Sequence, residues 1–112
     1  MKVVVSARGK DLESLLDPRF GRAPYLLFYD TEVDQLEVID NSSANQLAHG
    51  AGIQTAQSVL DKRPDLVVSG NFGPKAAQVL QAGSIKLATC PVVTISEVLD
   101  LVKADKVTPF TG

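Results

Sequence analysis

The sequence predicts an α/β protein with one mixed five-stranded sheet and helices on its faces. Three observations predict this fold: a β-branched run near the N-terminus, two strand-like segments separated by four residues, and two later repeats of an apolar strand followed by a helical pattern. The chain has 112 residues, and 45% of them are hydrophobic. This length and composition suit one compact domain over residues 1–112, with no room for a second.

The first half of the chain supplies three strands. Lys2–Ser6 is a β-branched run typical of a buried central strand. In the long connection that follows, Asp11–Leu16 has room for a single helical turn before Asp17-Pro18 stops it. Tyr25–Asp30 and Gln35–Asp40 are joined by only four residues, which predicts a hairpin whose second strand is the more exposed.

The second half alternates helices and strands. Residues 41–48 are polar and predict a loop, and helical spacing then predicts a helix from about His49 to Lys62. The short strand Leu66–Ser69 precedes a helix that starts at Pro74, where the missing amide donor of proline costs nothing. Ile85–Ala88 is the last strand that the pattern predicts.

The final helix has a clear start signal. Thr94 and Glu97 have the spacing of a capping box, so we expect a helix over about Ile95–Ala104. The tail, Asp105–Gly112, shows no periodic pattern. We therefore expect the tail to be loosely attached.

These elements determine a sheet topology. The hairpin makes the second and third strands antiparallel, whereas the helical crossovers require parallel neighbours. The simplest unknotted arrangement has the strand order 3-2-1-4-5. The connections after strands one, three, four and five then emerge at one edge, and α/β sheets bind ligands where strand order reverses, here between strands one and four.

Cationic and glycine-bearing segments collect at that edge. Its centre is the basic loop Asp17-Pro18-Arg19-Phe20-Gly21-Arg22-Ala23-Pro24-Tyr25, which its prolines keep out of regular structure. Helices that start near His49 and Pro74 aim unpaired amide donors at the same space. The implied ligand is an anion larger than a single phosphate. The candidate binding residues that this edge collects are Arg8, Arg19, Arg22, Asn45, His49 and Lys75, together with the glycine-rich turns.

Charge and cysteine content exclude several classes of protein. The net charge of −2 provides no general field for nucleic acid. One cysteine, Cys90, excludes an internal disulfide, a four-cysteine zinc site and a cluster with four thiolate ligands, so a metal centre would have to arrive preassembled. Cys90 follows the last strand and is more typical of a small buried hydrophobic residue than of a ligand. No signal-peptide core or membrane span is present, so we expect a soluble, cytoplasmic protein without a membrane partner.

Three motifs carry a resemblance to a known family. They are Phe20-Gly21-Arg22-Ala23-Pro24-Tyr25 after a strand, His49-Gly50-Ala51-Gly52 opening a helix, and Gly70-Asn71-Phe72-Gly73-Pro74-Lys75-Ala76 before another. In these motifs and their order, the chain from Met1 to about Lys103 resembles the dinitrogenase iron–molybdenum cofactor biosynthesis family. The family includes NifX-like proteins, the C-terminal part of NifB and the orange protein of sulfate reducers. Asp17-Pro18-Arg19 makes the chain most similar to the small orange-protein-like members.

The resemblance implies a ribonuclease-H-like three-layer fold and binding of a preformed molybdenum-containing metal–sulfur cluster. It implies as cargo the iron–molybdenum cofactor, its precursor or a molybdenum–copper sulfide, and as partners cofactor-assembly or redox-complex proteins. By this resemblance, the residues placed at the cluster mouth are Arg19, Phe20, Gly21 and Arg22. The second motif would place His49, Gly50 and Gly52 across from it, and the third contributes Gly70, Asn71, Gly73 and Lys75. Gly83-Ser84-Ile85 departs from the direct Gly-Ile step of the family, which affects register rather than chemistry.

Several candidates also have a simpler structural interpretation. His49 is compatible with a helix-start residue, a cluster contact or a metal ligand. Phe72 is compatible with packing, and Arg8 and Lys75 with solvated charges.

Four classes of function compete. A non-enzymatic carrier of an anionic cluster is favoured. A nucleotide- or phosphate-binding module lacks both the phosphate-loop spacing and the Gly-x-Gly-x-x-Gly pattern. A nuclease would need carboxylates that converge on divalent ions, and Val3–Ser6 and Leu66–Ser69 supply none. A protein-interaction domain without a cluster also remains open.

Overall fold

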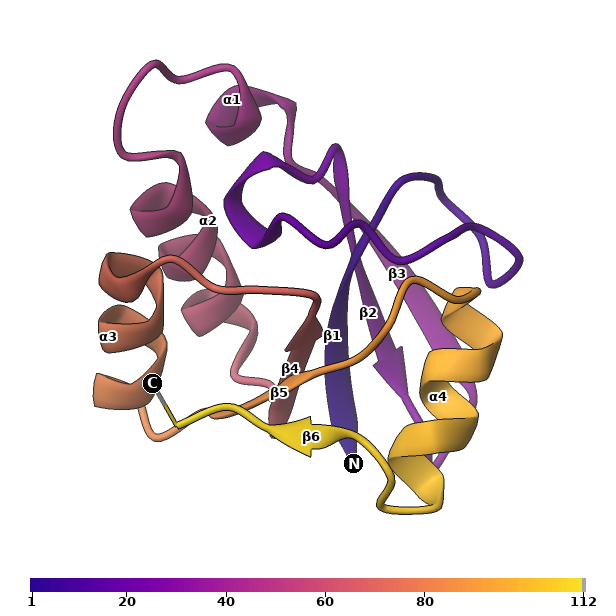
Figure 1. Ribbon diagram of the computed structural model, residues 1–112. Coiled ribbons are helices and arrows are strands. Elements are labelled where there is room, and N and C mark those ends of the chain that lie inside the picture. The colour runs from indigo at the N-terminus through magenta and orange to yellow at the C-terminus, as the bar shows by residue number, and fades with distance from the viewer. Residues whose placement is uncertain (112) are drawn as a thin grey trace.

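The computed structural model describes residues 1–111 and places six strands in one mixed sheet (Figure 1). The strands are β1 (Lys2–Ala7), β2 (Tyr25–Asp30), β3 (Gln35–Asp40), β4 (Leu66–Ser69), β5 (Lys86–Thr89) and β6 (Thr108–Pro109). They lie in the order β3-β2-β1-β4-β5-β6. β1, β4 and β5 are parallel, whereas the β1–β2, β2–β3 and β5–β6 pairs are antiparallel. The predicted order 3-2-1-4-5 is confirmed, and the prediction of five strands was one strand short.

Helices cover both faces of the sheet and make a three-layer fold (Figure 1). α2 (Ala51–Lys62) and α3 (Pro74–Ala82) cover one face, and α4 (Ile95–Lys103) covers the other. The short helix α1 (Ser42–Asn45) and the 3-10 turn η1 (Phe20–Arg22) lie beside the start of α2. Within residues 1–111, no helix has the length and apolar character needed to cross a membrane.

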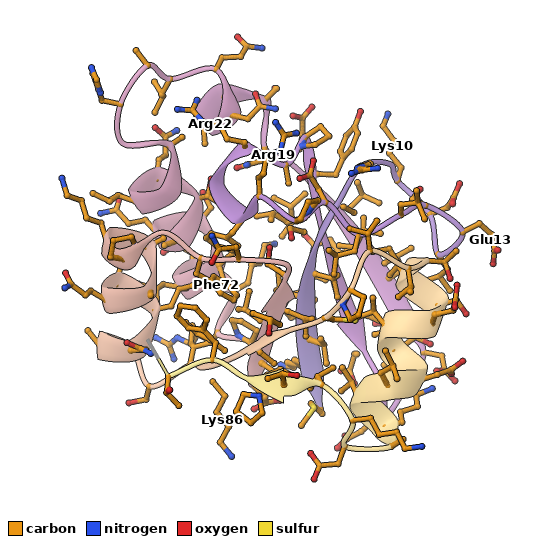
Figure 2. The ribbon with its side chains drawn as sticks, in the orientation of Figure 1. Lys10, Glu13, Arg19, Arg22, Phe72 and Lys86 are labelled. Carbon is orange, nitrogen blue, oxygen red and sulfur yellow. The ribbon has the colours of Figure 1, made fainter. Side chains whose placement is uncertain are left out.

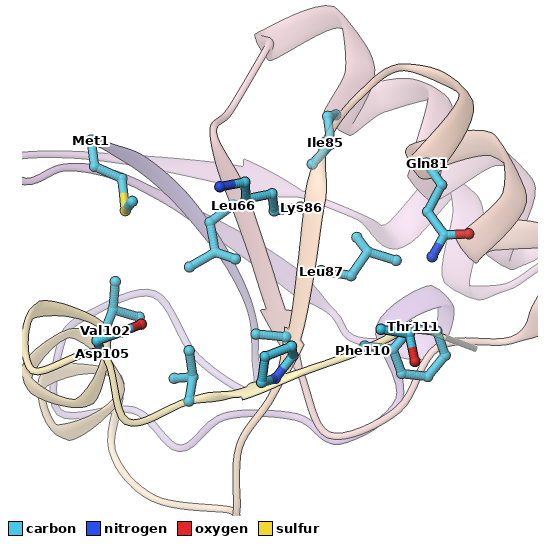
Figure 3. A pocket seen from close by; sticks show the side chains of 13 residues that line it. Met1, Leu66, Gln81, Ile85, Lys86, Leu87, Val102, Asp105, Phe110 and Thr111 are labelled. Atoms are coloured by element: carbon cyan, nitrogen blue, oxygen red, sulfur yellow. The ribbon is translucent and has the colours of Figure 1, made fainter.

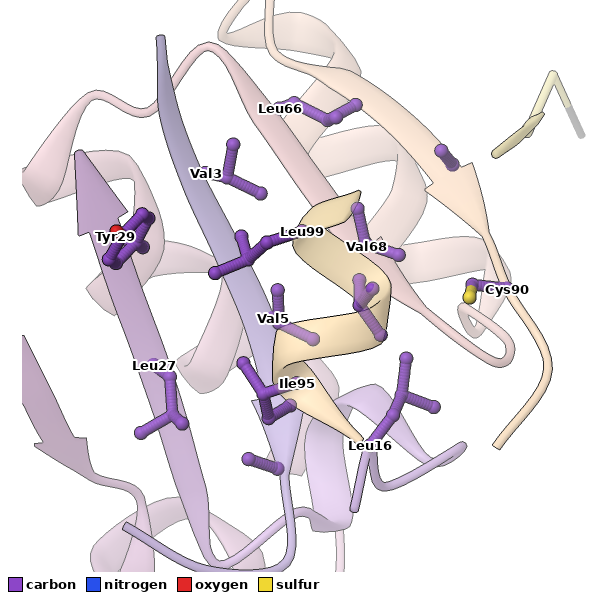
Figure 4. Close-up of a cluster of buried hydrophobic side chains, with 13 residues drawn as sticks. Val3, Val5, Leu16, Leu27, Tyr29, Leu66, Val68, Cys90, Ile95 and Leu99 are labelled. Carbon is purple, nitrogen blue, oxygen red and sulfur yellow. The ribbon is translucent and has the colours of Figure 1, made fainter. Parts of the chain in front are cut away.

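The alternation of side chains along β1 explains the two halves of the core. Val3 and Val5 point toward α4 and pack with Ile95 and Leu99, as Figure 4 shows. Val4 points the other way, toward α2 and α3. Because successive side chains of a strand face opposite sides, a strand covered on both faces has to be apolar throughout, as this run is.

The tail is attached to the sheet, contrary to the sequence-based expectation. β6 pairs with β5 through Ala88–Pro109 and Thr89–Thr108, and the Phe110 amide donates to the Leu87 carbonyl at 2.9 Å. The ring of Phe110 lies 5.1 Å from that of Phe72. A two-residue edge strand that contains proline has no recognisable strand pattern, and only its tertiary contacts create it.

Two connections also differ from expectation. Residues 41–48 contain α1 rather than loop alone, and α2 begins at Ala51, because Gly50 has a left-handed φ of 79° that ends the preceding loop. His49 therefore lies in the loop before the helix. The helical turn expected over Asp11–Leu16 is present only as a turn over residues 11–14, in which the Ser14 amide donates to the Asp11 carbonyl at 3.1 Å, and Leu15 and Leu16 then form isolated bridges. The capping box of α4 is present, since Thr94 Oγ1 accepts from the Glu97 amide at 3.2 Å.

Cys90 lies in the core on the α4 side and is 7% exposed. Burial, with a smaller contribution from Glu97, raises the pKa of the Cys90 thiol. The Cys90 thiol of the folded protein therefore stays neutral at pH values where the unfolded chain begins to ionise it. Because the folded protein then keeps a proton that the unfolded chain has lost, the free energy of unfolding falls as pH rises through the ordinary pKa of a thiol.

We expect native Cys90 to be alkylated more than about tenfold slower at about pH 8 than the same residue in the urea-unfolded chain, because the thiolate is the reactive form. Mass spectrometry after timed iodoacetamide treatment measures the two rates. A Ser43→Cys, Cys90→Ala variant, whose thiol is at an exposed position, serves as the control for accessible thiol. Equal rates for native and unfolded Cys90 would contradict the prediction.

Candidate functional site

The three glycine motifs meet in one groove beyond the C-terminal ends of β1 and β4. The groove consists of two adjoining hollows of about 460 and 360 Å³ that share Gly50, Gly52 and Gly73. We call it the glycine groove. Its lining residues are Pro18, Arg19, Phe20, Gly21, Arg22, Ala48, His49, Gly50, Ala51, Gly52, Ile53, Asn71, Gly73, Pro74, Lys75 and Ala76. Figure 2 shows Arg19 and Arg22 on this side of the molecule, near η1 and α1.

Ten of the thirteen predicted site residues line the glycine groove, and Arg8, Asn45 and Gly70 do not. Arg8 is exposed in the loop after β1, where its amide donates to the Leu15 carbonyl. Asn45 contributes only a backbone carbonyl, to Arg22. Gly70 packs against Pro18, which lines the groove, and a Cβ at Gly70 would lie 2.6 Å from Pro18 Cα.

Two buried hydroxyls hold the loop that contains Asp17 against the ends of β1 and β4. Ser6 Oγ lies 2.7 Å from both the Asp17 carbonyl oxygen and Ser69 Oγ, and both serines are completely buried. Ser6 ends the valine run of β1 and Ser69 ends that of β4. A serine closing two neighbouring valine-rich strands is the sequence signal that could have identified this pair.

The charge of Arg19 is largely balanced by an ion pair with the buried carboxylate of Asp17. Asp17, only 1% exposed, accepts from the Arg19 amide at 2.9 Å, from Nε at 3.2 Å and from Nη2 at 3.1 Å. The hydrogen bond and charge of Asp17 raise the pKa of Arg19. Arg19 also forms a parallel bridge with Asn71, which ties the first motif to the third. Arg19 is therefore more a structural clamp than a free cation.

Arg22 keeps its charge at the groove. Its Nη1 donates to the carbonyls of Asn45 at 3.0 Å and Leu47 at 2.5 Å. These acceptors are neutral, so the guanidinium remains a net cation. The same bonds hold the loop that leads to His49, which places the first and second motifs side by side.

Two helices direct free amide donors into the glycine groove. The caps of α2 and α3 are Gly50 and Gly73, and neither has a side-chain capping bond. The first amides with helical acceptors are those of Gln54 and Ala77. The amides at 51–53 and 75–76 therefore have no acceptor within their helices, and such helix starts attract anions.

A close backbone approach joins η1 to α2. A Cβ added at Gly21 would lie 2.7 Å from Gly52 Cα and 2.8 Å from Gly52 N. Only glycine allows this distance. The first and second motifs are therefore coupled by direct backbone contact as well as by Arg22.

Asn41 and Thr55 form a buried support that the sequence did not reveal. Asn41 Nδ2 donates to the Ala23 carbonyl at 2.9 Å, and Asn41 Oδ1 accepts from Thr55 Oγ1 at 3.1 Å. Asn41 is 3% exposed and Thr55 is fully buried. Asn41 follows β3 and Thr55 lies in α2, so no local pattern connects them.

We expect Asn41→Ala to destabilise the protein by about 1–3 kcal/mol, because it leaves a buried carbonyl and a buried hydroxyl without their partner. Urea unfolding followed by circular dichroism measures the change. Asn45→Ala is the matched control, since its side chain makes no hydrogen bond within the described chain. Equal stability of the two variants would contradict a supporting role for Asn41.

The donor set suits a preformed anion rather than a bare metal ion. Neither hollow has an aspartate or glutamate among its described lining residues. In contrast, Arg22 and His49 line one hollow of the groove, and Lys75 lines the other. Within residues 1–111, no group of three histidine, cysteine or acidic side chains could hold a metal. Cys90 belongs to the core on the α4 side, whereas Phe20 of the groove belongs to the opposite core. Binding here would use charge and N–H donors at the ligand surface.

A hollow larger than either part of the glycine groove lies elsewhere. It measures about 700 Å³ and is formed where the tail crosses β5, between Leu66, Val102, Val107 and Phe110 (Figure 3). No residue of the three glycine motifs lines it. Its mostly apolar walls offer an anion little, so the smaller glycine groove is the better candidate site.

Known proteins resemble this chain over almost its whole length. Residues 1–105 match the model of a family described as dinitrogenase iron-molybdenum cofactor. The apo form of the orange protein from Desulfovibrio gigas is similar in structure, with a TM-score of 0.95 and 34% identity over 99% of this chain and 93% of that chain.

Two further proteins are similar along most of their length. A Thermotoga protein provisionally named NifB has a TM-score of 0.83 and 31% identity, covering 99% of this chain and 97% of its own. An uncharacterized protein of Methanocaldococcus jannaschii is 26% identical over 98 residues, which cover 85% of this chain and 82% of that protein.

Proposed function

The chain belongs to the dinitrogenase iron-molybdenum cofactor family, and from this premise we propose that it is a non-enzymatic carrier of a preformed, anionic metal–sulfur cluster that contains molybdenum. The family connects the chain with iron–molybdenum cofactor biosynthesis or binding. The observation that carries the finer proposal is the glycine groove, where two helix starts and unbalanced cations converge without a lining carboxylate in the described chain.

The groove is suited to contacts with the outer atoms of a cluster. Sulfide and oxide atoms on an anionic cluster accept hydrogen bonds, and the amides at 51–53 and 75–76 are donors without helical acceptors. Arg22 adds a guanidinium, and Lys75 adds a mobile ammonium at the start of α3. His49 is the one groove side chain able to ligate a metal atom directly, and we propose cluster contact as its main role.

Energetics require these features to act together. A cation about 4 Å from an anion contributes about 1 kcal/mol in water and about 4 kcal/mol at an effective dielectric of 20. Each helix start adds about 0.3–1 kcal/mol, and micromolar affinity needs about 8 kcal/mol. Because Asp17 balances Arg19, affinity depends on Arg22, His49, Lys75 and the two helix starts.

Anaerobic reconstitution tests this function. Purified protein is incubated with tetrathiomolybdate and copper(I), or with isolated iron–molybdenum cofactor, and is then desalted. We expect a coloured complex with a fixed ratio of molybdenum to protein by metal analysis. A retained ratio near zero with every cluster would contradict the carrier function.

A phosphate-binding module is the competing function, because free helix starts also bind phosphates. Calorimetry with nucleotides and with inorganic phosphate separates the two functions. Heat of binding from nucleotides, together with no retained cluster, would favour the competitor.

The proposal also covers the partners and location of the protein. The cargo is received from or delivered to cofactor-assembly or redox-complex proteins, and the protein works in the cytoplasm.

A further inference from the structure

β3 is an open edge of the sheet. Within residues 1–111 it pairs only with β2, and five of its six residues are exposed, with Ile39 half-exposed. Its register runs without a bulge from Tyr25–Asp40 to Asp30–Gln35, and it contains neither proline nor lysine. Proteins commonly protect an edge strand with one of these devices. β3 lacks these three devices, and its only charged side chains are those of Glu37 and Asp40.

Exposed apolar side chains gather on the same hairpin. Val33, Leu36 and Val38 are 59%, 37% and 39% exposed, and they are half of the large exposed hydrophobic residues of the described chain. Leu36 and Val38 are two positions apart in β3 and therefore lie on one face. This face continues the apolar surface of β2 at the edge of the α4 layer, since Val38 is opposite Leu27.

The hairpin is also acidic. Five of the thirteen acidic residues of the protein, and no lysine or arginine, lie between positions 30 and 40. Glu37 pairs with Lys62 at 2.6 Å, and Glu32 lies 3.6 Å from the N-terminal ammonium. The other three carboxylates have no ion-pair partner among the described residues.

A hollow beside β3 fits a basic side chain. It measures about 460 Å³, and its walls include the ring of Phe28 and the carboxylates of Asp30 and Glu37. Glu37 already pairs with Lys62, and Lys2 also lines the hollow, so Asp30, which has no ion-pair partner among the described residues, is the carboxylate available to a basic side chain. An apolar ring with nearby carboxylates suits the methylene stem and charged end of lysine or arginine.

We propose that β3 is a docking edge for an extended segment of a partner protein in which apolar and basic residues alternate. Such a segment adds a strand to the sheet through main-chain hydrogen bonds, and its side chains are selected by Asp30 in the hollow and by Leu36 and Val38. A second copy of this chain fits less well, because it would bring two acidic hairpins together. β3 contributes no lining residue to the glycine groove, so docking leaves the groove accessible.

Hydrogen exchange measured by NMR on the full chain tests the proposal. The probe is a synthetic peptide of about ten alternating valine and lysine residues, a length sufficient to pair with β3. The control peptide has the same side chains but carries N-methyl groups on alternate amides, which removes strand pairing and keeps the charge. We expect the probe to slow exchange of β3 amides by about tenfold, a change well beyond that from charge screening alone. The control peptide is expected to have no such effect.

Two variants with the same added charge separate strand pairing from electrostatics. Val38→Lys places a lysine within the strand, whereas Val33→Lys places it in the turn. We expect Val38→Lys to weaken binding of the probe by about tenfold and Val33→Lys by less than about threefold, because lysine on an edge blocks pairing. Two-dimensional spectra confirm that both variants fold.

Four results would overturn the proposal. They are equal weakening by the two variants, equal binding of the N-methylated peptide, no protection at millimolar probe, and concentration-dependent protection of β3 in protein alone. The last of these would indicate a second copy as the occupant. None of them depends on whether a cluster binds in the glycine groove, so failure here is distinct from failure of the carrier function.

Discussion

Gly21→Ala is expected to destabilise the protein and to abolish cluster loading. The new Cβ would lie 2.7 Å from Gly52 Cα, and this neighbour is backbone, which cannot rotate away. Overpacking of this kind costs about 1–3 kcal/mol. Relief requires η1 and the start of α2 to separate, and this movement would displace the amides at 51–53 from the glycine groove.

Urea unfolding and metal retention after reconstitution measure the two effects of Gly21→Ala. Gly73→Ala is the matched control, because it also adds one methyl group to the groove lining. Gly73 has a φ of −65°, and a Cβ there meets nothing within 4 Å. We expect its stability to change by less than about 1 kcal/mol. If Gly21→Ala loads cluster as well as Gly73→Ala does, the close approach of the two motifs is not needed for binding.

The double variant His49→Gln, Lys75→Gln is expected to bind cluster about 10- to 100-fold more weakly while leaving stability almost unchanged. Neither side chain makes a hydrogen bond or ion pair within the described residues, so their removal breaks no structural contact. A groove charge worth about 1.4 kcal/mol corresponds to a factor of ten in affinity.

Competition between wild-type and variant protein for limiting cluster, read by visible absorption after separation, measures that loss. Lys86→Gln changes the same charge at the start of β5, outside the glycine groove, and serves as the control. The affinity of the wild type is also expected to fall with added salt more steeply than that of the double variant, because screened charges contribute less. Equal affinities for all three proteins would remove the electrostatic basis of the proposed site.

Much of the fold could be predicted because its signals are local. The valine run of β1, the hairpin of β2 and β3 and the capping box of Thr94 and Glu97 each arise from residues close in sequence. The tail could not be predicted, since β6 exists only through its pairing with β5 and through the contact of Phe110 with Phe72.

The candidate site divides in the same way. Sequence motifs identified most groove residues, because glycines, basic residues and helix starts gathered in loops at one sheet edge are the features that bind anions. They did not reveal that Asp17 is buried against Arg19, so the sequence overstated the free positive charge. They also missed Asn41 and Thr55, whose partners are distant in the chain.

By itself, the sequence determined the α/β class, the strand order of the first five strands and the segments that form the groove. These follow from apolar periodicity and from residues that allow only certain backbone conformations. Only the tertiary structure decided which charges stay unbalanced, that the tail joins the sheet and that β3 remains open. These properties depend on which distant atoms come within a few ångströms of one another, and no local pattern of residues encodes that distance.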